Sequence, residues 1–481
     1  MEILAIIIGF VVTGILSFVL RNRRLTEGLS LAVTAVGLVV STLVAYRVST
    51  SGTYEPFSFI SVDSLGALVM LLVSVVAFFV ALYAVPYFRK ETDKKIIDDR
   101  HVRQYYALSA IFLAFVLSTA AVSNPVAAWI FLEATTLSTV FLISFYRRSS
   151  NVEAAWKYLI VNAVGLLLAF FGTLLYFTSV AHGGGVAGLV HWDTLAAYAK
   201  QLDPAVVRIA FIFALIGYGT KVGLAPMHTW KPGAYAKSPA PLGALFSGAL
   251  LPVAFLILLR FKSITDVAVG PAFSQHLLIG FGVLSIVIAA FSIFATEKNK
   301  RLLAYSSIEH AGIMALGFGF GGIGVMAAVL HMIYHSLVKP ALFFLTGNML
   351  LRYHSTYIAD VRGAMSILPS NSVLYFAALF AIVGFPPFGM FLTEFFILSS
   401  GVTTYTVVVA VALLAMSVAF IGFFRHANAM LFGEPPRGIE KTKTSPWLLV
   451  PSAALLGITL FITFYTPPFV QTLIHEAVGK I

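Results

Sequence analysis

Apolar runs long enough to cross a lipid bilayer recur along the whole chain, and they constrain its fold more than any other feature. A membrane-spanning helix needs about 20 consecutive apolar residues. Runs of this length follow one another with only short polar segments between them, and none of these segments is long enough to fold separately. The pattern predicts an all-α membrane protein made of one polytopic domain.

Fourteen spans result when the apolar runs are divided at charged residues and at Gly or Pro. They are residues 2–20, 28–47, 64–88, 104–122, 125–146, 154–181, 205–226, 241–261, 276–296, 301–320, 322–350, 371–400, 403–425 and 446–466. Translocation disfavours positive charge, so basic loops stay on the cytoplasmic side. Loops after odd-numbered spans hold 23 basic residues, and the alternate loops with the carboxyl tail hold 6. This parity predicts a multi-pass protein of a prokaryotic inner membrane with both termini outside, on the periplasmic side.

The composition excludes several classes of chemistry. The chain has no cysteine, so it cannot form disulfides, thiolate zinc sites or cysteine-ligated iron–sulfur clusters. Its net charge is +11, but the basic residues fall in short loops where membrane topology explains them. No nucleic-acid partner is therefore expected. No cofactor is expected in this chain, and any redox group must belong to a partner subunit.

Five charged side chains fall inside apolar spans: Glu133, Lys221, Glu309, Lys339 and Glu394. Each costs about 2.5–3.5 kcal/mol near the bilayer centre, so such residues normally face the protein interior. One interpretation is that they pair and only hold helices together. The other is a proton path, because burial brings carboxylates and lysines into the range where they exchange protons near neutral pH.

Histidines favour the proton path. His331, His335 and Lys339 recur at intervals of four, which places them on one face of the eleventh span. His228 and His310 lie near other spans. Water between such groups would complete a proton relay. No Glu or Asp completes a recognisable metal-ligand spacing with these histidines, so no metal site is expected.

Two spans contain residues that interrupt helices. Lys221 in the seventh span is followed by Gly223 and Pro226. In the twelfth span Gly384, Pro386 and Pro387 precede Glu394. Proline removes a backbone donor, so each span should unwind where protein or water can satisfy the freed carbonyls. An ordinary proline kink is the alternative interpretation.

The interrupted spans indicate two inverted repeats. Glu133 precedes Lys221 by 88 residues, and Glu309 precedes Glu394 by 85. Glu133 lies about nine residues from the outer end of its span, and Glu309 lies about nine residues from the inner end of its span, as inversion requires. The predicted units are residues 104–261 (helices 4–8) and 276–426 (helices 9–13), flanked by peripheral helices in 1–90 and a fourteenth helix in 446–466.

Four motifs resemble the antiporter-like membrane subunits of respiratory complex I, multisubunit Na+/H+ antiporters and group 4 hydrogenases. They are the strings around Glu133 (Trp129–Leu137), Lys221 (Gly219–Trp230), Glu309 (Lys300–His310) and Glu394 (Gly384–Phe395). The string Ser-Ser-Ile-Glu-His and the terminal glutamate are most similar to component F of hydrogenase-4 and formate hydrogenlyase. The resemblance implies fourteen helices in two inverted five-helix units, an ion pair between Glu133 and Lys221, and a polar axis that ends at Glu394.

The chain departs from this family in two places. Pro252 stands where many relatives carry a lysine of the eighth helix, so one relay group is missing. After Trp230 the chain reads Lys231-Pro-Gly-Ala-Tyr-Ala-Lys237, where relatives carry acidic residues. This change reverses the charge at the predicted proton entrance.

The sequence therefore predicts a proton-translocating subunit of a membrane-bound redox complex, with other membrane subunits and a peripheral redox arm as partners. Iron–sulfur clusters and a nickel–iron site or flavin would lie in those partners. A subunit of a Na+/H+ antiporter without redox chemistry is the second interpretation, with Na+ as the alternative ion, and a membrane anchor is the third. Chemistry by this chain alone is not expected, because it has no glycine-rich dinucleotide turn and no cluster ligands.

Overall fold

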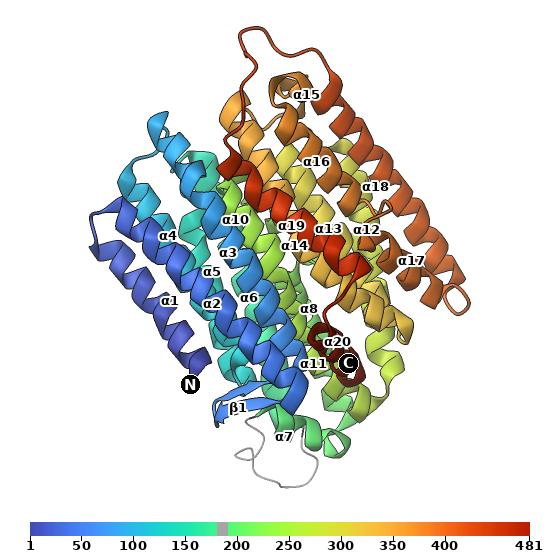
Figure 1. Ribbon diagram of the computed structural model, residues 1–481. Coiled ribbons are helices and arrows are strands. Elements are labelled where there is room, and N and C mark those ends of the chain that lie inside the picture. The colour runs from blue at the N-terminus through green and yellow to red at the C-terminus, as the bar shows by residue number, and fades with distance from the viewer. Residues whose placement is uncertain (180–190) are drawn as a thin grey trace.

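The computed structural model describes residues 1–179 and 191–481, and these residues are almost entirely helical. The helices form a bundle of tilted, roughly parallel rods (Figure 1). Helices α1–α4 lie at one edge of the bundle and α18 at the other, while α8, α11 and α14 run through its middle. Most side chains of α10, α11 and α14 are buried, so the protein core lies around these helices.

The elements follow the predicted all-α plan. The helices are α1 (Glu2–Val19), α2 (Arg23–Ser51), α3 (Ser64–Asp93), α4 (Asp99–Ala121), α5 (Pro125–Ile143), α6 (Ser149–Thr178), α7 (Trp192–Ala197), α8 (Pro204–Val222), α9 (Trp230–Lys237), α10 (Ala240–Leu245), α11 (Leu251–Val269), α12 (Pro271–Ala295), α13 (Asn299–Phe320), α14 (Ile323–Tyr353), α15 (Ala364–Ile367), α16 (Pro369–Ile382), α17 (Gly389–Gly401), α18 (Thr406–Phe432), α19 (Pro446–Phe464) and α20 (Pro468–Lys480). Two antiparallel strands, β1 (Tyr54–Phe57) and β2 (Ile60–Val62), form a small hairpin.

The predicted spans each have a helical counterpart. Twelve helical stretches are long and apolar enough to cross a membrane, with Pro204–Lys237 and Ala240–Val269 each counted as one stretch. Helix α13 adds a buried stretch of 22 residues, and the short apolar helices α16 and α17 together match the predicted twelfth span. Residues 180 and 181, at the end of the predicted sixth span, lie outside the described residues.

Both predicted helix interruptions are present. Helix α8 ends at Val222, where Gly223 adopts a left-handed conformation with φ +87°, and the chain resumes through a 3₁₀ turn, Met227–Thr229, into α9. Helix α16 ends at Ile382, Gly384 has φ +68°, and α17 begins at Gly389. A glycine suits both positions because it has no Cβ to oppose a positive φ.

A third irregularity was not predicted from the sequence. Residues Phe246–Leu250 form a π-helical turn between α10 and α11. Gly248 packs there against the carbonyl of Ser336 and the ring of Pro340, leaving no room for a side chain. Pro340 cannot donate to the carbonyl four residues earlier, so two weakened helix segments face each other at the bundle centre.

Four of the basic residues counted with the loops have partners inside the protein instead. Helix α11 runs eight residues beyond the predicted span, and near its end Arg260 pairs with Asp63 at 3.0 Å and Lys262 with Asp266 at 2.7 Å. Lys231 and Lys300 are buried, and both donate to backbone carbonyls. A count of charges along the sequence could not detect these internal partners.

The two chain ends lie toward the same end of the bundle, beside the hairpin and α7 (Figure 1). The terminal ammonium of Met1 donates to the hydroxyl of Tyr54 at 3.2 Å, and Lys262 donates to the carbonyl of Ile481 at 3.0 Å. An even number of spans requires this arrangement. The hairpin, α7 and α20 were not predicted, since they are too short or too polar to produce a span signal.

Candidate functional site

Lys221 begins a line of buried polar groups through the middle of the bundle. It occupies the last turn of α8 and is 1% exposed. Its ammonium donates to the hydroxyl of Thr136 at 2.7 Å and to that of Tyr158 at 3.4 Å. Tyr158 in turn shares a 2.7 Å hydrogen bond with Thr139. Hydroxyl groups of α5 and α6 thus hold the ammonium in place.

Glu133 lies one helical turn from Thr136 on α5 and is half-buried. The two charges influence each other, but they form no ion pair within 4.0 Å, and one carboxylate oxygen of Glu133 has no hydrogen-bond partner among the described residues. The direct ion pair implied by the family resemblance is therefore not formed. The ammonium of Lys221 donates to Thr136 instead, so the two charged groups are not in contact, and we call the pair open.

Lys231 continues the line, although the sequence indicated a loop position. It is 1% exposed, and its ammonium donates to the carbonyl of Val222 at 2.5 Å, at the carboxyl end of α8. A cation is favourable at this end of a helix because the last carbonyls carry partial negative charge. The side chain packs on Gly223, and α9 packs against α13, the helix that carries Glu309 and His310.

Helix α14 carries the centre of the line, as the four-residue spacing predicted. His331, His335 and Lys339 are all fully buried on one face. Lys339 donates at 2.9 Å to the carbonyl of Leu303 on α13, the helix that also carries Glu309. His335 stacks near His310 with ring centroids 5.5 Å apart, yet neither of its nitrogens has a partner among the described residues.

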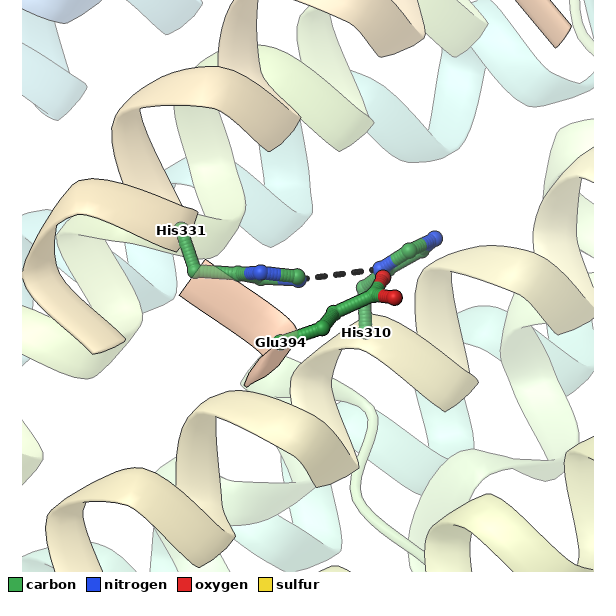
Figure 2. A group of neighbouring side chains, drawn as sticks. All are labelled: His310, His331 and Glu394. Atoms are coloured by element: carbon green, nitrogen blue, oxygen red, sulfur yellow. Dashed lines mark hydrogen bonds between the residues drawn. The ribbon is translucent and has the colours of Figure 1, made fainter. Parts of the chain in front are cut away.

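The bond between His310 and His331 has a direction that the surrounding groups fix. Nδ1 of His310 lies 3.0 Å from Nε2 of His331, and Nδ1 of His331 lies 2.8 Å from the hydroxyl of Thr393 (Figure 2 shows the first of these bonds). Thr393 uses its one proton to donate to the carbonyl of Met390 at 2.9 Å. It must therefore accept from His331, which leaves Nε2 of His331 to accept from His310.

Glu394 ends the line at the second helix interruption. It projects from the first turns of α17 toward the two histidines (Figure 2), and one ligand-type atom from each of the three side chains lies within 4.8 Å of the others. Its carboxylate rests on Gly384, whose missing side chain makes room for it. A cavity of about 390 Å³ opens beside Glu309, His310 and Glu394, and α18 closes its far side.

His228 is the one predicted site residue that the structure places away from this line. It lies in the 3₁₀ turn between α8 and α9 and is partly exposed. Its neighbours Pro226 and Thr229 are exposed, so this turn lies at the protein surface. His228 thus lies at the surface of the first interruption, while Lys231 fills its interior.

A second cavity, of about 500 Å³, lies at the end of the bundle opposite the termini. Glu91 of α3 lines it and is 3% exposed, accepting from Tyr146 at 2.7 Å and Tyr87 at 3.0 Å. His354 lies at its rim, where burial and the neighbouring charges of Lys94 and Arg352 lower the pKa of the imidazole. The sequence analysis missed Glu91, because it follows the apolar run of its span directly.

Two sequence signals could have located the missed residues. Lys231 precedes Pro232 and follows the interruption by one turn, which is a position where a buried cation can cap α8. Glu91 is four residues from Tyr87, so both lie on one face of α3. Lys231 and Glu91 are buried because groups from other helices bind them, and the spacing of residues along one helix does not reveal such partners.

A family model described as "NADH:quinone oxidoreductase/Mrp antiporter, TM" matches residues 122–420. The chain belongs to this family. The match covers α5 through most of α18, and so includes every residue of the buried line. The predicted family, the all-α membrane fold and the general interpretation as an antiporter-like, proton-translocating membrane subunit are confirmed.

Individual relatives agree with this assignment. The hydrogenase-4 component F homolog of Methylacidiphilum infernorum is 37% identical over 420 residues, which cover 86% of this chain and 87% of that protein. The fold matches a chain of the membrane-bound sulfane sulfur reductase, an archaeal respiratory membrane complex, with TM-score 0.87, 23% identity and coverage of 100% and 96%. A chain of the Mrp complex from Dietzia sp. DQ12-45-1b matches with TM-score 0.83, 19% identity and coverage of 99% and 96%.

Proposed function

We propose that this subunit moves protons along one line of buried groups, from Glu133 and Lys221 through Lys231, Lys339 and the central histidines to Glu394. The observation that carries the proposal is the juxtaposition of His310, His331 and Glu394, with Glu309 lining the same cavity. Buried ionisable groups in membrane proteins are costly and are normally retained for transport.

The open pair at Glu133 and Lys221 is the switch in this mechanism. In the open state Thr136 holds the ammonium of Lys221. A change of electric field from a partner subunit would draw Lys221 from Thr136 toward Glu133 or release it. Because charges interact strongly in a medium of low dielectric constant, this movement changes the proton affinity of the next group in the line.

Lys231 supplies the relay group that Pro252 removes from the eighth helix. It fills the interior of the first interruption, on a helix that packs against α13 and so lies beside Glu309 and His310 of the line. His335 and the hydroxyls of Ser306 and Ser336 are buried without protein partners among the described residues. Buried polar atoms are almost always hydrogen-bonded, so bound water is expected here and would connect Lys231 with the histidines.

Glu394 is the proposed exit, because the hydrogen bonds beyond His331 end at a backbone carbonyl. A proton that reaches Nε2 of His310 releases the Nδ1 proton to His331. Beyond His331 the bonds lead through Thr393 to the backbone carbonyl of Met390, which cannot pass a proton on. Glu394 is the neighbouring group that can accept a proton, and the 390 Å³ cavity next to it provides the way out.

We place the proton entrance at the 500 Å³ cavity, where Glu91 offers a buried carboxylate under a rim of basic residues. Lys300 connects this region with the core, because it donates to the carbonyl of Ser238 and its charge acts on Glu91. The basic loops put this end in the cytoplasm and both termini outside. In this proposal residues 104–261 and 276–426 are the inverted units, each with one interrupted helix, while 1–90 and 446–466 pack around them.

Electron transfer in partner subunits is the proposed source of energy. Support comes from the hydrogenase-4 component F homolog, the one of the three matches above that exceeds 25% identity. Other membrane subunits and a peripheral arm with iron–sulfur and nickel–iron or flavin groups would then complete the assembly. The Mrp match supports a Na+/H+ antiporter subunit as the alternative, and dependence of transport on Na+ distinguishes the two.

The test is proton pumping by the whole complex in sealed vesicles. Replacing Lys221 by alanine should abolish coupled proton movement while the partner subunits still transfer electrons. Lys262 provides a matched control, because it is equally buried but pairs with Asp266 away from the line. A Lys221→Ala complex that pumps as well as the Lys262→Ala complex would overturn the proposal.

A further inference from the structure

We propose that His310, His331 and Glu394 form a binding site for a divalent transition metal of the Zn²⁺ class. That the bound ion also stops proton movement follows only if the proposed function holds, whereas binding itself does not depend on it. The sequence gave no metal spacing because the three ligands come from three helices, α13, α14 and α17.

The donor set fits such an ion. Two imidazoles and one carboxylate are the three protein ligands of many open zinc sites, in which water takes the fourth position. One donor atom of each side chain already lies within 4.8 Å of the others (Figure 2). Ligands of a tetrahedral zinc at about 2.0–2.1 Å are about 3.3 Å apart, so the widest pair needs to close by at most about 1.5 Å.

Rotation of Glu394 can provide this movement. His310 and His331 already lie at 3.0 Å, and Glu394 is a flexible side chain over the bare backbone of Gly384. For Nδ1 of His310 to bind the metal, its proton would move to Nε2 of the same ring, so that both imidazoles stay neutral and each offers one lone pair. The 390 Å³ cavity reaches His310 and Glu394, so it offers both a path for the ion and space for the water ligand.

The surroundings of His331 fit a ligand role. Metal-binding histidines generally donate their second ring nitrogen to an oxygen, which fixes the tautomer and leaves the other nitrogen free for the metal. Here Nδ1–H of His331 donates to Thr393, and Thr393 is itself held by the carbonyl of Met390. Nε2 of His331 is therefore oriented toward His310 with its lone pair available.

Binding of Co²⁺ to the full-length protein in detergent or nanodiscs tests the site. Cobalt replaces zinc in such sites, and its visible absorption is intense only with tetrahedral ligands. We expect one bound Co²⁺ per chain, displaced by Zn²⁺, with the signal lost in His331→Gln and Glu394→Gln. His276→Gln is the control, because His276 contacts Tyr405 and lies outside the site.

Thr393→Val provides a second, milder variant. It removes the hydroxyl that orients His331 but no ligand, and should weaken metal affinity about 10- to 100-fold, while Thr393→Ser restores it. Unchanged cobalt binding in both His331→Gln and Glu394→Gln, or absence of stoichiometric binding by the unaltered protein, would overturn the site. If zinc binds at this site but pumping by the complex continues, the proton path through these residues is wrong and the metal site stands.

Discussion

Replacing Gly384 by alanine should move the Glu394 carboxylate while the fold stays intact. A Cβ atom at residue 384 would overlap the Glu394 carboxylate, so the carboxylate must move away from its present position. The backbone strain is modest, because a left-handed conformation costs a residue with a Cβ about 1–2 kcal/mol. The displacement has the larger effect, since an error of about 1 Å in the position of a reacting group can reduce a rate about 100-fold.

Gly270→Ala is the matched control for this substitution. Gly270 also has a positive φ, +98°, but a Cβ there would meet no atom within 4 Å. Both variants therefore carry backbone strain, and only Gly384→Ala displaces a carboxylate. We expect the Gly384→Ala complex to lose most proton pumping per electron transferred, and the Gly270→Ala complex to retain it. Equal pumping by the two would refute the argument that Glu394 must rest on Gly384.

Three further substitutions test other parts of the line in the same vesicle assay. Lys231→Met should abolish pumping, while Lys262→Met, which removes an equally buried lysine bonded to Asp266 outside the line, should not; equal rates would exclude a relay at residue 231. Thr136→Val removes the hydroxyl that holds Lys221 and should lower pumping about 10-fold or more, within the range of single proton-transfer contacts, whereas Thr136→Ser should preserve it. Glu91→Gln should slow pumping when proton uptake limits the rate, which is the case at high pH on the uptake side. Normal pumping by this variant at high pH on that side would place the entrance elsewhere.

The sequence predicted the features that depend on composition and on spacing along one helix. Apolar runs located the spans, the positive φ glycines lie where the two interruptions were expected, and the four-residue spacing put His331, His335 and Lys339 on one face. These features follow from local chemistry. Hydropathy and helix periodicity are both read within a single segment.

Contacts between segments could not be predicted in this way. Lys231 is charged and follows a span, so the sequence indicated a loop position. In the structure its ammonium instead binds a carbonyl at the end of α8. Glu394 completes the histidine group from a helix more than 60 residues further along the chain, so no spacing rule revealed the three side chains as neighbours. The open pair at Glu133 likewise depends on Thr136, a residue with no charge to draw attention to it.

The decisive measurement concerns His335, the central buried group that has no protein partner. Replacing it by leucine breaks no hydrogen bond between protein groups among the described residues, so only contacts with bound water are lost and the chain should still fold, which thermal unfolding checks. Proton pumping per electron should nevertheless be lost, while His276→Leu, at an exposed position, leaves it intact. A His335→Leu complex that pumps normally would contradict the claim that one continuous line of titratable groups crosses this membrane domain.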